Sequence, residues 1–205
     1  MSGKTENLLA QAKTETEEKT SISSARRKFE SAEQAKTAFA QLSEKLLRIA
    51  EWNFSSGIST FVLFDRNGAE KDRSEKARLG DFVRIKMPLT GKQDWVKITA
   101  IDDLPDELIL TVQPSYDPTE KQPDSKVTSH FFTGDSSNNF CLKLAESAVE
   151  MYVIGLNEVT NTEHTNHFLE SARNLATANL GHYLGIQISE WNKFCRDFIE
   201  TSDAA

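Results

Sequence analysis

Apolar residues recur every three or four positions between residues 26 and 52, where no glycine or proline interrupts the chain. Ala35, Phe39, Leu42 and Leu46 fall on one stripe of a helix with 3.6 residues per turn. The pattern predicts a long amphipathic helix over 26–52 that packs on the protein's own body. Because the same positions also form two short heptad series, a coiled-coil partner helix is the alternative use of this stripe.

The chain before this helix is polar. Residues 14–24 are mainly Thr, Glu, Lys and Ser, and such a run has little apolar surface to bury. We therefore expect residues 1–24 to form a flexible polar arm, followed by a single α+β domain over 25–205.

After residue 57 the periodicity shortens to two. Asn67-Gly68 favours a tight turn after the first β-rich run. The runs that we expect to be strands are 58–64, 81–87, 94–101, 108–113, 127–133, 139–144 and 149–154. Short strands at this spacing predict a strongly curved antiparallel β-sheet or a small β-barrel over 57–155.

The last quarter of the chain becomes helical again. Thr160 opens a capping-box pattern, Gly181 is suited to end a helix, and Ser189 is suited to begin another. We expect helices over 162–181 and 189–201. The predicted fold class is α+β, with the curved sheet flanked by a long N-terminal helix and two C-terminal helices.

Composition narrows the classes of function. The 205 residues include 24 Lys and Arg against 31 Asp and Glu, and this net charge of -7 argues against a dedicated nucleic-acid binder. Cys141 and Cys195 are too few for a disulfide framework or a four-thiolate zinc site. Since no apolar stretch is long enough for a membrane span or a secretory signal, we expect a cytoplasmic protein with no membrane partner.

Motifs for common chemistries are absent from the sequence. It contains no Walker-type phosphate loop, G-x-G-x-x-G, H-E-x-x-H or G-x-S-x-G. His164 and His167 have a spacing that brings two imidazoles to one side of a helix, where they could meet a metal ion. The spacing is common by chance, and exposed imidazoles at a polar helix start are the favoured explanation. We therefore predict no catalytic residue, metal site or cofactor.

Five residues of two neighbouring β-runs combine aromatic rings with cations. Strand alternation places Phe82, Arg84, Lys86, Trp95 and Lys97 on one side, opposite an apolar side. Small β-barrels use this combination to stack bases and hold a phosphate backbone. The structural interpretation has more weight: the cations lay their aliphatic stems over the rings, or the terminal helices cover them. Nucleic acid stays an alternative partner for this candidate binding face.

His130 is the only histidine of the predicted β-body and completes the set of candidate binding residues. The 12 phenylalanines could line a pocket between the β-body and the helices, with His130 as its polar group. Such a pocket would make the protein a small-ligand carrier or an enzyme.

Four segments resemble those of a group of uncharacterised bacterial proteins of about this size. They are Phe82-Val83-Arg84-Ile85, Asp94-Trp95-Val96-Lys97-Ile98, His130-Phe131-Phe132-Thr133 and Gly155-Leu156-Asn157-Glu158-Val159-Thr160-Asn161-Thr162. The resemblance runs over roughly residues 55 to 200. It implies a bacterial, cytoplasmic, accessory protein and no particular activity.

These observations favour a non-catalytic binding or assembly module. Its partner would be another protein, either a second copy or a foreign chain, reached through the stripe of the 26–52 helix or through an exposed edge strand. A carrier or enzyme that uses His130 is the alternative.

Overall fold

The computed structural model describes residues 3–15, 19–53, 59–86, 93–121, 129–130, 132–159 and 180–200, with side chains of the last helix described from residue 189. Its strands are β1 (Ser21–Lys28), β2 (Thr60–Phe64), β3 (Phe82–Lys86), β4 (Gln93–Asp103), β5 (Glu107–Pro114), β6 (Ser137–Ala145) and β7 (Ala148–Leu156). Its helices are α1 (Lys4–Thr14), α2 (Ala32–Leu47), the 3-10 helix η2 (Ile49–Trp52) and α4 (Leu180–Glu200). The predicted α+β class is confirmed.

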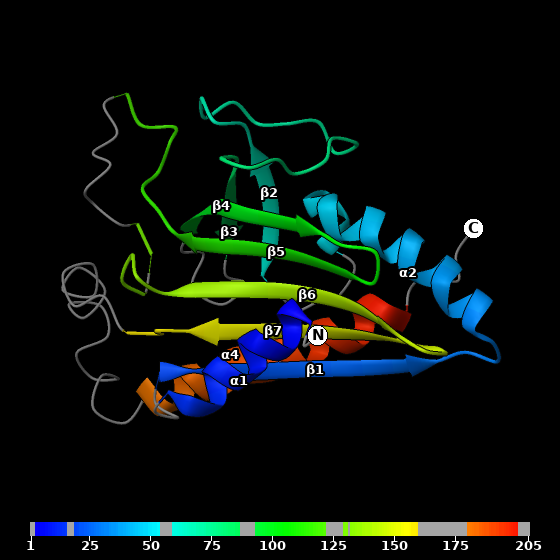
Figure 1. The fold of residues 1–205 in the computed structure, drawn as a ribbon. Coiled ribbons are helices and arrows are strands. Elements are labelled where there is room, and N and C mark those ends of the chain that lie inside the picture. Colours follow the sequence, from blue (N-terminus) through cyan, green and yellow to red (C-terminus); the bar gives the residue numbers. More distant parts are fainter. Residues whose placement is uncertain are drawn as a thin grey trace.

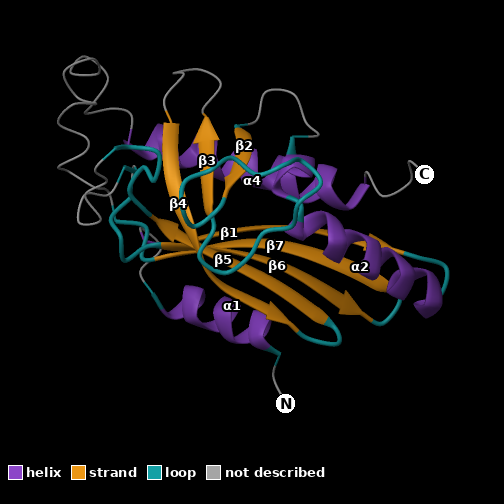
Figure 2. Cartoon of the chain, turned by 90° about the horizontal axis from the view of Figure 1, so that it is seen from above, coloured by secondary structure: helices purple, strands orange, loops and turns teal. Residues whose placement is uncertain are grey.

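The strands form one antiparallel sheet in the order β1-β7-β6-β5-β4-β3-β2. β1 and β2 lie at its two edges, so the described sheet is open, which corrects the barrel alternative. A register shift between Ile98 and Ala100 marks a bulge in β4, and bulges bend a strand. Figure 2 shows β2, β3 and the adjoining part of β4 turned sharply against the other strands. The sheet therefore has a concave and a convex face.

Helices cover both faces of the sheet. α2 and α4 lie on the concave face, whereas α1 lies on the convex face (Figure 2). Figure 1 shows α1 and α4 on opposite sides of β7 and β1. The large apolar core lies on the concave face, and α1 packs on a smaller convex cluster that includes Ile109, Cys141 and Ile154.

The predicted N-terminal helix is shorter than 26–52. α2 begins after Ser31, whose hydroxyl accepts the N–H of Gln34 at 3.2 Å as an N-cap. Its stripe, including Leu42 and Leu46, packs into the concave core as predicted. The helix ends at Leu47, and η2 then places Trp52 in the same core.

Residues 21–28 form a strand where we predicted the end of an arm and the start of a helix. Every residue of β1 is in register with a residue of β7, from Ser21 opposite Gly155 to Lys28 opposite Ala148. This ladder satisfies backbone groups that a helix would otherwise bond internally. The local helical pattern is overruled by a partner strand that is distant in sequence.

The predicted flexible arm contains helix α1, which is docked on the convex face. Glu107, which is 2% exposed, lies beneath its first turn. The Glu107 Oε2 atom accepts the backbone N–H groups of Lys4 at 2.8 Å and Thr5 at 3.3 Å. A carboxylate at this position satisfies free N–H groups and is favoured by the helix dipole. Ion pairs of Lys4 with Asp102 and of Glu6 with Lys143 add to the docking.

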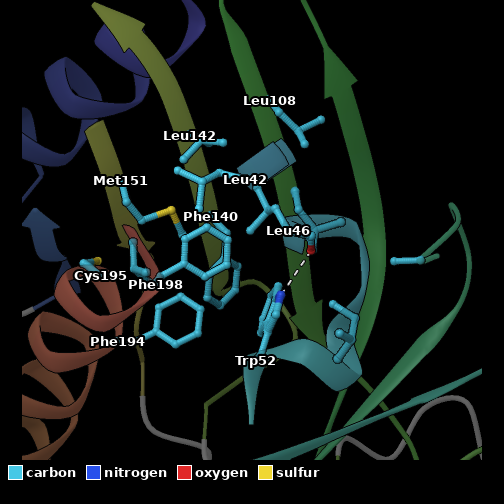
Figure 3. Packing of buried hydrophobic residues seen from close by; sticks show 14 of the residues in the cluster. Leu42, Leu46, Trp52, Leu108, Phe140, Leu142, Met151, Phe194, Cys195 and Phe198 are labelled. Atoms are coloured by element: carbon cyan, nitrogen blue, oxygen red, sulfur yellow. Dashed lines mark hydrogen bonds between the residues drawn. The ribbon is translucent and has the colours of Figure 1, made fainter. Parts of the chain in front are cut away.

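Aromatic rings fill the centre of the concave core (Figure 3). Trp52 lies between α2 and the sheet, with its ring centroid 4.6 Å from that of Phe140 and 5.4 Å from that of Phe194. Its indole Nε1 donates to the Leu46 carbonyl at 3.1 Å, so the buried ring leaves no unmet donor. These rings join η2, β6 and α4 into one packed unit.

The C-terminal helices differ from the prediction. α4 runs from Leu180 to Glu200, so Gly181 and Ser189 lie inside it instead of at a stop and a start. The predicted helix over 162–181 falls mostly outside the described residues. At the end of α4, Lys45 donates to the Phe198 carbonyl at 2.9 Å and Arg27 to the Ile199 carbonyl at 3.0 Å. These cations satisfy free carbonyls where the helix dipole favours positive charge.

Six of the seven predicted strands are confirmed as β2 to β7, with small changes at their ends. The seventh, over 127–133, is wrong where it is described: residues 129, 130 and 132–133 belong to no named strand. Asn67-Gly68 forms the expected turn, with Gly68 at a φ of 80° that glycine adopts without strain.

We expect Phe194→Ala to lower the free energy of unfolding by about 3–5 kcal/mol, because it empties a site among buried rings. Phe194 is 0% exposed, whereas Leu79 is 63% exposed, so Leu79→Ala is the matched control and should change stability by less than about 0.5 kcal/mol. Urea denaturation followed by far-UV circular dichroism measures both. Equal losses in the two variants would contradict this description of the core.

Candidate functional site

The five residues of the predicted cationic and aromatic face do share one side of the sheet. In the antiparallel pairing of β3 and β4, Phe82 is opposite Lys97 and Arg84 is opposite Trp95. Lys86 continues the same face at the end of β3. This is the convex face, on the side opposite the aromatic core.

The rings of this face are buried. Phe82 is 1% and Trp95 2% exposed, and together with Phe64 they form a small cluster. Tyr116 packs edge-on to Phe82 with centroids 5.4 Å apart. The Arg84 guanidinium lies 5.0 Å from the Phe64 centroid, and the Lys97 ammonium lies 5.4 Å from the Phe82 centroid. The cations therefore cover rings in the described structure, and base stacking would require them to move.

His130 is separate from the other five candidates. Its Nε2 atom is 3.8 Å from Oδ2 of Asp94, and both residues are buried. Asp94 precedes Trp95 in β4 and is in register with Ile85, which packs against the concave core. His130 therefore approaches the concave face. Its Nδ1 atom accepts the N–H of Phe132 at 2.9 Å, which leaves the proton of a neutral ring on Nε2, toward Asp94.

A second group of polar residues lies on the concave face of β1, β7 and β6. Ser21 and Asn138 are both in register with Gly155 and flank it on the two sides. Gly155 lies two residues beyond Val153, a concave core residue, so all three positions point toward the concave side.

After β7 ends, the chain turns so that the Glu158 side chain lies over Gly155 and beside Ser21. A Cβ atom on Gly155 would lie 2.2 Å from Glu158 Oε1, so glycine leaves the space that the carboxyl occupies. Asn157 makes the turn with a φ of 52°, in the left-handed region that asparagine tolerates. The N–H of Glu158 donates to the Lys19 carbonyl at 2.9 Å, which fixes the backbone of this turn.

The Glu158 carboxyl is buried, with 6% of the residue exposed. Burial raises its pKa, and hydrogen bonding from Ser21 and Asn138 only partly opposes this shift. Among the described residues, Glu158 Oε1 and Asn138 Oδ1 are buried without a hydrogen-bond partner. Unmet buried acceptors are rare in folded proteins and call for an explanation.

These residues lie at one end of the sheet, where β1, β4 and β6 begin and β7 ends. We call this group the polar end: Ser21, Asp94, His130, Asn138 and Glu158. It adjoins the aromatic core, because Phe140 follows Asn138 on the same face of β6. The Trp191 ring of α4 is 5.3 Å from that of Phe140, and its buried Nε1 also has no described partner. An apolar surface therefore meets a few buried polar groups with unused hydrogen-bonding capacity.

Sequence reasoning named His130 as a candidate binding residue and did not name the other members of the polar end. Asn138 is in phase with Phe140 and Leu142, and Asp94 is in phase with Val96 and Ile98. Polar residues at core positions of a strand were the available signal. Ser21 and Glu158 carry no such signal, because the pairing of β1 and the turn after β7 bring them together.

The helix stripe and one of the two sheet edges, which the sequence suggested as routes to a protein partner, are occupied by the protein itself. The α2 stripe is buried in the core. At the edge strand β2, Asn53 accepts the N–H of Phe61 at 2.8 Å and donates to its carbonyl at 2.9 Å. The N–H of Lys71 donates to the Leu63 carbonyl at 2.9 Å. The groups that could pair with another strand are thus bonded internally.

The metal hypothesis concerns His164 and His167, which lie outside the described residues. Within those ranges, no three His, Cys, Asp or Glu side chains form a metal-binding group. None of the described helices combines the length and apolar character that a membrane span requires.

Comparisons with known proteins bear on the fold. No family model and no curated protein match the chain. A hypothetical protein from Helicobacter pylori has a similar structure, with a TM-score of 0.52 and 8% identity over 89% of this chain and 86% of that chain. A major latex-like protein from Panax ginseng has a TM-score of 0.37, with 13% identity over 76% of this chain and 94% of that chain. The similarity to the Helicobacter pylori protein shows a shared fold and carries no activity.

We expect Asn53→Ala to open the edge of β2. The loss of two hydrogen bonds to Phe61 should cost about 1–3 kcal/mol of stability, and the freed strand edge should promote self-association. Light scattering coupled to size-exclusion chromatography measures the mass. Asn192→Ala, at an exposed position of α4, is the control. An unchanged mass and stability for Asn53→Ala would refute the role of this side chain.

We expect Glu158→Gln to flatten the dependence of stability on pH. Because the pKa of Glu158 is raised from about 4.5, its contribution to stability is complete below that pH and is lost as pH rises through the folded-state pKa. The variant has no proton to lose there. Denaturation at intervals from about pH 4.5 to 7.5 measures the slope. Glu120→Gln, in an exposed loop, should keep the wild-type slope, and the same slope in all three proteins would exclude a buried titrating Glu158.

Proposed function

We propose that the protein is a non-catalytic binding protein that holds a small amphipathic molecule at the polar end of its concave face. The observation that carries this proposal is the set of buried polar atoms without partners beside an aromatic surface. Ligand sites in proteins are mostly apolar, with a few polar groups that orient the ligand. The polar end has this composition.

The unpaired buried atoms cost the free protein stability that a ligand could restore. An unmet buried donor or acceptor costs about 1–3 kcal/mol, which a bound molecule with matching groups would recover. Glu158 Oε1 and Asn138 Oδ1 offer two acceptors, and Trp191 Nε1 offers one donor. The rings of Phe140 and Trp191 supply apolar contact beside them. A ligand with polar and apolar parts matches this set.

Binding is favoured over catalysis because neither the two cysteines nor Ser136 offers an activated nucleophile. Burial raises the pKa of both Cys141 and Cys195 to about 12, so neither forms a thiolate near neutral pH. The Ser136 hydroxyl donates to the Thr133 carbonyl at 2.8 Å. Nucleophilic catalysis needs such a group activated by a base, so we assign none.

A small ligand is favoured over a protein partner because the helix stripe and the β2 edge are occupied. The other edge strand, β1, carries Arg26, Arg27 and Lys28, and charged residues are typical of edges protected against pairing. The bacterial origin and the cytoplasmic location expected from the sequence stay proposals.

We expect a screen of small amphipathic fragments by protein-observed NMR to give binders that shift the Asn138 side-chain amide and the Trp191 indole signals. Asn138→Leu should weaken these binders about tenfold, since it removes the polar atoms from the site. Gln113→Leu is the matched control, because Gln113 lies on a convex strand position opposite Lys97. Binders that map only to the convex face, or equal affinity in wild type and Asn138→Leu, would contradict the proposal.

A further inference from the structure

We propose that Glu158 and Asn138 form a subsite for the protonated primary amine of the bound molecule. This inference rests on the proposed function and names the chemical class of the ligand. It would give the polar end a preference for cationic amines over neutral or anionic molecules of the same shape.

The unpaired atoms of the subsite are both hydrogen-bond acceptors. Glu158 Oε1 and Asn138 Oδ1 are both acceptors, buried and without a hydrogen-bond partner in the described structure. An alkylammonium group has three N–H donors and no acceptor, so it can satisfy both atoms at once. A carboxylate or phosphate would instead meet two further acceptors at the subsite.

The charge around Glu158 also favours a cationic ligand. Glu15 and Lys19 contact the turn that carries Glu158, and Asp135 precedes the strand that carries Asn138. None of the ion pairs of the described residues includes Glu158. Glu15 instead accepts the N–H of Asn157 at 3.4 Å. The causes of the Glu158 pKa shift are burial and hydrogen bonding, with no charged neighbour among them. A buried carboxylate without a counter-ion is costly, and a ligand cation would provide that counter-ion.

The subsite is ordered before any ligand binds. Three features hold the Glu158 carboxyl over Gly155 in the protein without ligand. They are the backbone hydrogen bond from Glu158 to Lys19, the left-handed conformation of Asn157 and the absence of a side chain at Gly155. A site that is already ordered binds with a smaller entropic cost.

Without a ligand, burial favours the neutral, protonated form of the Glu158 carboxyl. The amine would replace this proton: the neutral carboxyl releases a proton to solvent, and the resulting carboxylate pairs with the ammonium. Charge and atoms balance, because one cation enters as one proton leaves. Amine binding should therefore tighten as pH rises, until Glu158 is fully ionised.

Phe140 and Trp191 adjoin the subsite and would contact the apolar part of the ligand. Their rings also attract a nearby cation through their electron-rich faces. The predicted ligand therefore has an apolar or aromatic body that ends in a primary amine.

The test compares three probes of one shape: benzylamine, benzyl alcohol and benzoate. Isothermal titration of the full chain at intervals from about pH 4.5 to 7.5, in two buffers of different ionisation enthalpy, measures both affinity and proton release. We expect benzylamine to bind at least about tenfold more tightly than the other two, with net release of protons. Glu158→Gln should remove the preference and the proton release. Glu190→Gln should keep both, since Glu190 is another half-buried carboxyl, located on α4.

The outcomes separate the two proposals. If benzyl alcohol binds as tightly as benzylamine and shifts Asn138, the amine inference is wrong and the binding function stands. If Glu158→Gln keeps the amine preference while its unfolding curve shows a folded protein, the subsite is wrong. Asn138→Leu provides a second variant, in which the preference should also fall. If no probe binds and the fragment screen is empty, both proposals fail.

Discussion

β1 pairs with β7 along its whole length, although most of the chain separates the two strands. The other parts of the concave side depend on this pairing. It completes the face on which α4 packs, and it brings Arg27 to the end of that helix, where Arg27 bonds the Ile199 carbonyl. It also places Ser21 beside Gly155, so that the polar end is assembled by the same ladder that builds the sheet.

The middle of the concave face is aromatic and fully packed, whereas the polar end contains buried polar groups. Toward the middle, the rings of Trp52, Phe140 and Phe194 fill the space between the sheet and the helices, and the indole of Trp52 is satisfied by Leu46. Dense aromatic packing of this kind stabilises the fold and leaves few buried polar atoms that need a hydrogen-bond partner. At the polar end, Glu158 and Asn138 keep atoms buried and unpaired. Proteins tolerate such costs where a ligand recovers them, and this contrast is the physical basis of the proposed binding function.

The convex face shows a different use of similar residues. Arg84 and Lys97 cover Phe64 and Phe82, so that charged side chains close a second, smaller cluster. The same residue types that mark a nucleic-acid surface in some proteins can serve as the cover of a strand pair. Burial of the rings separates the two interpretations, and burial depends on Tyr116, which follows the end of β5.

The sequence by itself determined the features that arise from local periodicity. Alternation predicted six strands and the two faces of β3 and β4, and the helical stripe predicted how α2 packs, because side-chain direction repeats every two residues in a strand and every 3.6 in a helix. The tertiary structure decided what depends on distant partners. Residues 21–28 are a strand because β7 lies beside them, α1 is ordered because Glu107 meets its first turn, and Glu158 reaches the concave face because Gly155 leaves room for it. Pairing and burial between distant segments are absent from any local pattern, so these features could be read only in the folded chain.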